Sequence, residues 1–278
     1  MLDVFHKKEK PFQGLVGMGG GVVSRVLGGD PGPDFLTDSN AANLYLALPL
    51  TNYKSSVTGG AYVDVAPLIK GSGSAKVATQ TGNTSISSAV ASPFTQYTGS
   101  MLWGTTTTTS DLFYYSLQLG SNQVLTIEFW LYHLSTRDNS YAFVQTNNFG
   151  GGSYPAWVWG TYYQDFDGLN YFSNSSPSGH RPSSGTSLNL NDWSHVAMCC
   201  NGTNTLKMFI NGTQVYSGAY GPNSGESIFT IGPSSWDGIP SVENERFQDF
   251  RIYTGVQKYT SSFTIDKDDP DYGGRILG

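Results

Sequence analysis

Hydrophobic and polar residues alternate along the C-terminal third of the chain. Between Trp193 and Cys200 successive residues fall on opposite faces of an extended segment, which is the period of a β-strand. Asn201-Gly202 and Asn211-Gly212 interrupt this pattern. Asn-Gly favours a tight hairpin, because both central residues of a type I′ turn need a positive φ. The pattern therefore predicts an antiparallel meander, with Cys199 and Cys200 on opposite faces of one strand.

Strand-like segments recur over most of the chain. The first covers residues 43–50 and ends near Pro49, and a central strand covers residues 124–133. Turn residues separate the segments at intervals of about 8–12 residues, the spacing of a β-sandwich. No helical period of useful length is present, and the best helix candidate is a short turn near residues 255–259. The pattern predicts an all-β protein.

Several separated motifs carry a family resemblance. They are TIEFWL at 126–131, NDWSHVA at 191–197, MFING at 208–212, FTIG at 229–232 and DFRIYTGVQKYTSSFT at 249–264. Together they resemble the concanavalin A-like lectin/glucanase domains of the laminin-G-like type. The resemblance implies a two-sheet antiparallel jelly-roll sandwich over residues 36–265. The amino-acid sequence of the last motif resembles a motif that is common in tailed-phage virion proteins.

Composition narrows the class of protein. The 278 residues include 17 Tyr, 15 Phe and 6 Trp, only 13% are charged, and the net charge is −6. The aromatic and low-charge composition is typical of an exposed β protein. No basic stripe is present, which argues against a nucleic-acid partner. No segment reaches the ~20 apolar residues of a spanning helix, so membrane insertion is not expected.

The first 35 residues differ from the rest. They contain a mixed-charge stub and glycine runs, with too few apolar residues to fold alone. We expect an extended arm that docks into a groove on another protein, and it resembles the arms that dock marine-phage tail and fibre proteins. The predicted anchoring residues are Phe5, Phe12, Leu15, Val16, Met18, Val22 and Val23. Residues 266–278 are expected to form a polar C-terminal tail.

Paired carboxylates bear on a possible enzymatic activity, because glucanases share the sandwich fold. Retaining glycosidases place two carboxyl groups ~5–5.5 Å apart, and the chain offers Asp165/Asp167 and Glu243/Glu245. Neither pair extends to the E-x-D-x-x-E pattern of the glucanases, because Gln248 stands where an acid is needed. The chain is therefore predicted not to be an enzyme and to need no cofactor. His195 is predicted to be a packed or surface strand residue rather than a ligand. A calcium site made of loop acids and carbonyls stays open, without a location.

Aromatic residues are the better candidates for ligand contact. Alternation places Trp157 and Trp159 on the same face of one strand, and one face of that strand must belong to the core. The other face is expected to stack on sugar rings or on a neighbouring subunit. The predicted glycan-binding residues are Trp157, Trp159, Tyr162, Tyr163 and Trp236.

These observations lead to one functional prediction and two alternatives. The chain is predicted to be a structural protein on the surface of a tailed-phage virion, with a lectin-like sandwich displayed for attachment to host glycans. Its expected partners are other virion proteins, such as a tail adaptor, nozzle or capsid, and further copies of itself, for example in a trimer. The alternatives are a capsid decoration or cement protein without a ligand, and a glycan-cleaving enzyme on the same fold.

Overall fold

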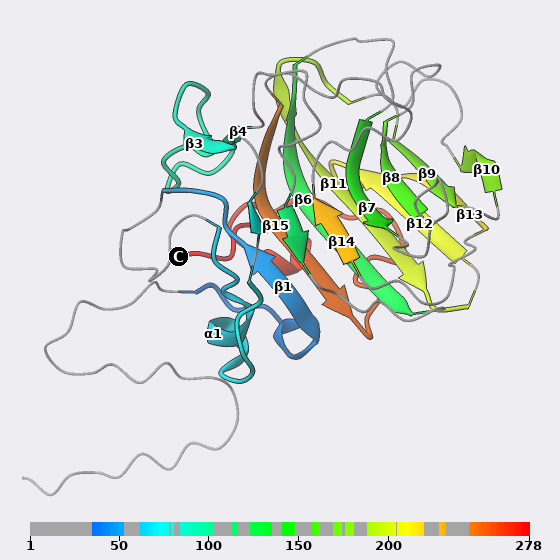
Figure 1. Cartoon of the computed structure of the whole chain (residues 1–278), viewed down its shortest axis with the longest axis horizontal. Helices are drawn as coiled ribbons and strands as arrows, with labels where there is room; N and C mark the ends of the chain where they lie inside the picture. The colour runs from blue at the N-terminus through cyan, green and yellow to red at the C-terminus, as the bar shows by residue number, and fades with distance from the viewer. Residues whose placement is uncertain are drawn as a thin grey trace, which may run out of the picture.

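The computed structural model confirms the predicted antiparallel sandwich (Figure 1). It describes residues 35–52, 62–77, 79–80, 84–102, 113–115, 123–134, 141–147, 157–161, 169–173, 176–180, 188–203, 205–219, 228–231 and 245–278. An eight-stranded sheet has the order β13-β12-β11-β6-β15-β4-β3, with β1 also paired to β15. A seven-stranded sheet has the order β10-β9-β8-β7-β14-β5-β2. The predicted arm lies outside the described residues, except for Phe35.

The strands have the following bounds. The eight-stranded sheet contains β1 (Leu44–Leu48), β3 (Ser85–Ser87), β4 (Ser100–Leu102), β6 (Val124–His133), β11 (Asp192–Asn201), β12 (Thr205–Ile210), β13 (Thr213–Ala219) and β15 (Arg246–Thr254). The seven-stranded sheet contains β2 (Thr79–Gln80), β5 (Phe113–Tyr115), β7 (Tyr141–Asn147), β8 (Trp157–Thr161), β9 (Leu169–Ser173), β10 (Ser176–His180) and β14 (Ile228–Ile231). Three short helical turns are described: η1 (Ala41–Asn43), α1 (Ala66–Lys70) and η2 (Pro270–Tyr272).

The main core lies between the two sheets. Alternate residues of β6 from Leu125 to Leu131 point into it, and the seven-stranded sheet contributes Val144, Trp159, Leu169 and Ile231. The Phe129 ring packs edge-on against Trp159 at 5.3 Å and stacks on Phe247 at 4.9 Å. Burying such a side chain stabilises the fold by about 1.5–3 kcal/mol. The two-residue period along β6 therefore produces one wholly apolar inner face.

A β-bulge adjusts this period in β15. Phe247 and Phe250 are three residues apart, yet both lie in the core between the sheets. The register between β15 and β6 shifts between Gln248 and Arg251, and Asp249 has a φ of 53°. The extra residue of a bulge restores the inward direction of the following side chains. Arg251 consequently points to the outer face of the sheet.

The two Asn-Gly dipeptides form different turns. Asn211 and Gly212 have φ values of 48° and 77°, which confirms the hairpin prediction between β12 and β13. At the other dipeptide only Gly202 has a positive φ. There β11 runs through Asn201, whose side-chain oxygen accepts hydrogen bonds from the backbone N–H groups of Thr203 and Thr205. This second connection is an Asx-type loop rather than a two-residue turn.

The helical prediction was wrong in position. Residues 255–259 are not helical, because Gly255 has a φ of 81° and the chain then continues without a helical turn. The α1 helix was not predicted, since its five residues are too few to show a period. It ends at Gly71, which has a φ of 68°. Within the described part of the chain, no helix is long and apolar enough to cross a membrane.

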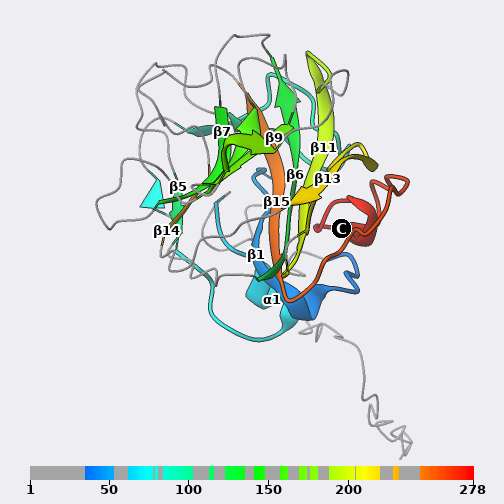
Figure 2. The same ribbon diagram turned by 90° about the vertical axis from the view of Figure 1, so that its right-hand side faces the viewer.

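The C-terminal segment, residues 266–278, packs onto the outer face of the eight-stranded sheet (Figure 2). Ile276 and Leu277 are each only 1% exposed. They join a second apolar cluster with Trp130 and Tyr253 on that face. Phe35 forms an isolated antiparallel bridge with Leu277. The expected polar tail is thus an integral part of the sandwich and lies beside the point where the described chain begins.

Candidate functional site

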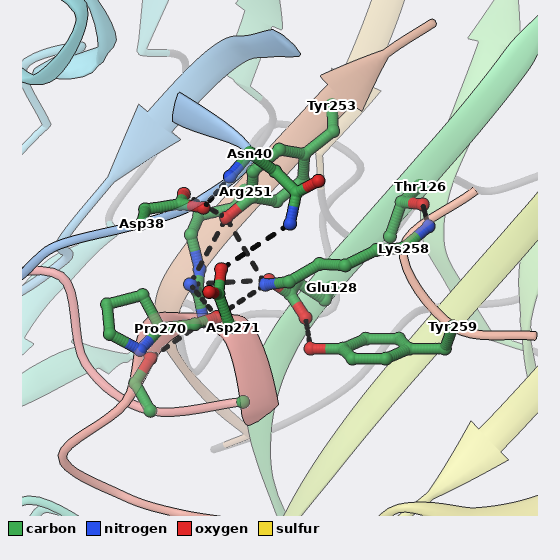
Figure 3. A network of polar contacts seen from close by, with 12 residues as sticks. Asp38, Asn40, Thr126, Glu128, Arg251, Tyr253, Lys258, Tyr259, Pro270 and Asp271 are labelled. Atoms are coloured by element: carbon green, nitrogen blue, oxygen red, sulfur yellow. Dashed lines mark hydrogen bonds and ion pairs between the residues drawn. The ribbon is translucent and has the colours of Figure 1, made fainter. Parts of the chain in front are cut away.

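A network of buried charges centres on Glu128 of β6 (Figure 3). Strand alternation turns Glu128 to the outer face, where it is fully buried. Its Oε1 lies 2.6 Å from Lys258 Nζ and 3.3 Å from Arg251 Nη1. Its Oε2 accepts a hydrogen bond from the Tyr259 hydroxyl at 2.6 Å and lies 3.3 Å from His195 Nε2. One carboxylate therefore holds partners from β11, β15 and the segment after β15.

The charges of this network follow from burial and pairing. Burial opposes ionisation of Glu128, but the adjacent Arg251 and Lys258 outweigh it and hold the carboxyl pKa well below its usual value. For His195, burial dominates and lowers the pKa in spite of Glu128. Burial likewise lowers the pKa of Lys258, although Glu128 favours its charge. At neutral pH the carboxylate is ionised and the imidazole is neutral.

The same network fastens both ends of the described chain. Arg251 donates hydrogen bonds to the carbonyl oxygens of Pro270 at 3.1 Å and Gly274 at 2.8 Å. The Tyr253 hydroxyl donates to Asp38 Oδ2 at 2.8 Å. The two Arg251 hydrogen bonds satisfy backbone carbonyl groups that are buried on this face. The network thus connects β15 to residues before β1 and to the C-terminal segment.

A second buried carboxylate holds the last residues. Asp249 Oδ2 accepts hydrogen bonds from the Tyr97 hydroxyl at 3.2 Å and from the Ile276 backbone N–H at 3.0 Å. Burial raises the pKa of Asp249 to about 6, although Arg251 lowers it in part. The Tyr97 oxygen in turn accepts a hydrogen bond from the Leu277 N–H at 3.1 Å. The bulge in β15 therefore supplies the group that receives the C-terminal backbone.

The arrangement acts as a structural clamp rather than a catalytic centre. Glu128, Arg251 and His195 are each 0% exposed, and the C-terminal segment covers them. A general acid or base must come within hydrogen-bond reach of a substrate proton, and these groups are enclosed by protein. Sequence reasoning did not identify Glu128 as a site residue. The available signal was a lone acid within the apolar run TIEFWL.

Of the four carboxylates proposed for the enzyme alternative, the structure describes Glu245. Glu245 is 1% exposed, and its Oε1 contacts His133 Nδ1. Asp165, Asp167 and Glu243 lie outside the described residues. Among the residues that the structure describes, no group of three or more His, Cys, Asp or Glu side chains could hold a metal ion.

The prediction that Trp159 binds glycans was wrong. Trp159 is fully buried and packs against Phe129, because the face of β8 that carries it is the core face. A sugar could not reach its ring. Trp157 lies on β8, but its side chain is outside the described part of the structure. The remaining candidates, glycan-binding and arm residues, also lie outside it: Tyr162, Tyr163, Trp236, Phe5, Phe12, Leu15, Val16, Met18, Val22 and Val23.

Several solved structures similar to this one are toxin binding domains of very different sequence. The binding domain of Paraclostridial Mosquitocidal Protein 1 has a TM-score of 0.56 and 12% identity, over 81% of this chain and 51% of that chain. The receptor-binding domain of botulinum neurotoxin C/D mosaic serotype has a TM-score of 0.54 and 14% identity, over 81% and 49%. Botulinum neurotoxin type C, which depends on two ganglioside molecules to enter cells, has a TM-score of 0.51 and 14% identity, over 77% and 48%.

This chain spans about half the length of those toxin domains. At such identities the likeness establishes the fold alone. No curated protein matches the chain. The sequence family that does match is described as the concanavalin A-like lectin/glucanases superfamily, over residues 106–258, which is more than half of the chain. The chain therefore belongs to the concanavalin A-like lectin/glucanase superfamily and carries a laminin-G-like sandwich.

Proposed function

We propose that the protein is a non-enzymatic binding module for glycans on a host cell surface. The observation that carries this proposal is the burial of two glutamate side chains. Glu128 and Glu245 are both buried and each contacts a basic side chain, so neither is open to a glycosidic bond. The similar toxin structures are binding domains, and one of those toxins interacts with gangliosides. A binding role therefore fits the described sandwich better than hydrolysis.

The module belongs, in this proposal, to a tailed-phage virion, as a tail fibre or another tail component. Two features of the sequence support this virion role: the motif at residues 249–264 and the composition of the arm. The start of the sandwich also suits an anchor: Leu36 N–H bonds to Ile276 O at 3.0 Å, and Ser39 N–H bonds to Asp271 Oδ1 at 2.9 Å. A mechanical force on the arm would be transmitted through these hydrogen bonds to the C-terminal segment. Several copies on one particle would add avidity to weak glycan contacts.

The first test is binding of the full chain to a glycan array and to host cells. We expect saturable binding without release of sugar products. Release of products would overturn the non-enzymatic proposal, and absence of glycan binding by folded protein would favour the decoration or cement alternative.

The second test addresses the virion role. A variant that lacks residues 2–27 should keep the fold and the glycan binding of the full chain, but should not join particles. Co-sedimentation of this variant with particles would contradict anchoring by the arm. The full chain serves as the control, and residues 266–278 are retained in both proteins because they pack on the sandwich.

A further inference from the structure

Arg246, the first residue of β15, is a nearly buried cation that has no acidic partner among the residues that the structure describes. It is 5% exposed, and its one hydrogen bond joins Nη1 to the Ser87 carbonyl oxygen at 3.3 Å. Its Nε is buried without a partner. No carboxylate of the described residues forms an ion pair with it, unlike Arg251 and Arg275. A buried charge without a counter-ion is costly and requires an explanation.

Two aromatic rings adjoin this arginine on the outer face of the sheet. Arg246 is the register partner of Tyr132, and Tyr132 is the register partner of Trp193. The Tyr132 and Trp193 rings meet edge-to-face at 5.5 Å, and both residues are partly exposed. Their neighbours Leu131 and Phe247 point into the core, so the three side chains of the row share the outer face.

The end of β3 and the segment that follows it border the row. Ser87 accepts the bond from Arg246, and the Ala91 carbonyl oxygen accepts one from Trp193 Nε1 at 2.7 Å. The guanidinium and the indole are therefore held in place by backbone groups. Glu245, the acid next in sequence, contacts His133 instead of Arg246. Burial also lowers the pKa of Arg246, which is the expected effect when no anion compensates the charge.

We infer that Arg246, Tyr132 and Trp193 form a binding subsite for a carboxylate-bearing sugar, such as a sialic or uronic acid. The inference rests on the proposed glycan-binding function and specifies its ligand. A guanidinium N–H forms a charge-assisted hydrogen bond with a carboxylate, which is stronger than a bond to a neutral acceptor. Tyrosine and tryptophan rings offer an apolar face beside a polar edge, which suits the C–H face of a pyranose. A neutral sugar would leave the arginine unpaired, so the site should discriminate between the two sugar classes.

Titration calorimetry with the full chain tests this inference. The ligands are sialyllactose and glucuronic acid, with lactose and glucose as their neutral counterparts. We expect the acidic sugars to bind at least about tenfold more tightly, and Arg246→Gln to abolish that preference. Tyr132→Ala should weaken acidic and neutral sugars alike, by about threefold to tenfold. The controls are Arg275→Gln, in which the arginine has an acidic partner, and Tyr272→Ala, in which the tyrosine is 49% exposed elsewhere.

Thermal unfolding separates this role from a purely structural one. Because Arg246→Gln removes a buried unpaired charge, its melting temperature should equal or exceed that of the parent protein. Equal affinity for acidic and neutral sugars, an intact preference in Arg246→Gln, or a lowered melting temperature of that variant would each overturn the inference and leave glycan binding in place. Absence of binding to every glycan by the folded full chain would overturn both this inference and the proposed function.

Discussion

Glu128 and Arg251 face each other as register partners on β6 and β15, with 3.3 Å between Oε1 and Nη1. Both side chains are fully buried on the outer face of the eight-stranded sheet. Glu128 forms ion pairs with both Arg251 and Lys258, while Arg251 also donates hydrogen bonds to two carbonyl oxygens of the C-terminal segment. The C-terminal segment can therefore bury its polar backbone groups against the outer face of this sheet, because the pair supplies hydrogen-bond donors and balances part of the buried charge.

Removal of the central carboxylate should destabilise the fold strongly. Glu128→Gln removes the ion-pair partner of buried Lys258 and leaves Arg251 only the more distant Asp249, whose Oδ1 lies 3.7 Å from Nε. We expect the free energy of unfolding to fall by about 3–5 kcal/mol. Urea denaturation measures this change. Asp268→Asn is the matched control, because it also removes an acid paired with an arginine but at a side chain that is 73% exposed. A loss below about 1 kcal/mol for Glu128→Gln, within the range of surface ion pairs, would contradict the role of the network.

The pH dependence of stability should report on Asp249. Its folded-state pKa is raised to about 6 from 3.8, so the folded state retains a proton that the unfolded state loses between these values. This group therefore stabilises the fold at low pH, and its contribution is lost as the pH rises through 6. Asn tolerates the positive φ of this position. Asp249→Asn should thus gain stability relative to the parent by up to about 3 kcal/mol between pH 3.5 and pH 7.

Urea denaturation of both proteins across that pH range gives the difference directly. The exposed Asp268→Asn variant should show a much smaller pH-dependent difference from the parent protein. A constant difference between Asp249→Asn and the parent at all pH values would show that Asp249 titrates as an ordinary carboxyl group.

Loss of the C-terminal segment should unfold the protein. A chain that stops at Ile265 exposes Trp130, whose Nε1 donates to the Gly273 carbonyl oxygen at 2.8 Å, and removes both carbonyl partners of Arg251. We expect aggregation or a non-cooperative thermal transition at 25 °C and above. A variant without residues 2–27 is the control and should melt cooperatively. A cooperative transition of the chain that stops at Ile265 would mean that the segment is dispensable.

Trp159→Ala should act on stability and not directly on a ligand. The ring is buried against Phe129, so its truncation leaves a cavity, and we expect a loss of about 3–5 kcal/mol. Trp159→Phe fills part of the space and should lose less. Chemical denaturation distinguishes the two variants. A stable Trp159→Ala variant that had lost glycan binding would contradict the core position of this residue.

Much of the fold was predictable because its signals are local. Alternation along β6 and β11, and the positive-φ requirement of Asn211-Gly212, follow from strand geometry and turn sterics over a few residues. Local rules failed at Phe247 and Phe250, because strict alternation cannot place both rings on one face. Only the pairing of β15 with β6 positions the bulge at Asp249 that does so.

The sequence alone determined the strands, one hairpin turn and the superfamily resemblance, since each depends on neighbouring residues. Tertiary structure decided which face of each strand is covered. Trp159 lies in the core because the eight-stranded sheet packs against it. Glu128 is buried at the centre of the charge network because a segment more than one hundred residues later in the sequence packs against it. Tyr132 and Arg246 came together only through strand pairing. Burial depends on chain segments distant in sequence, so no local pattern contains it.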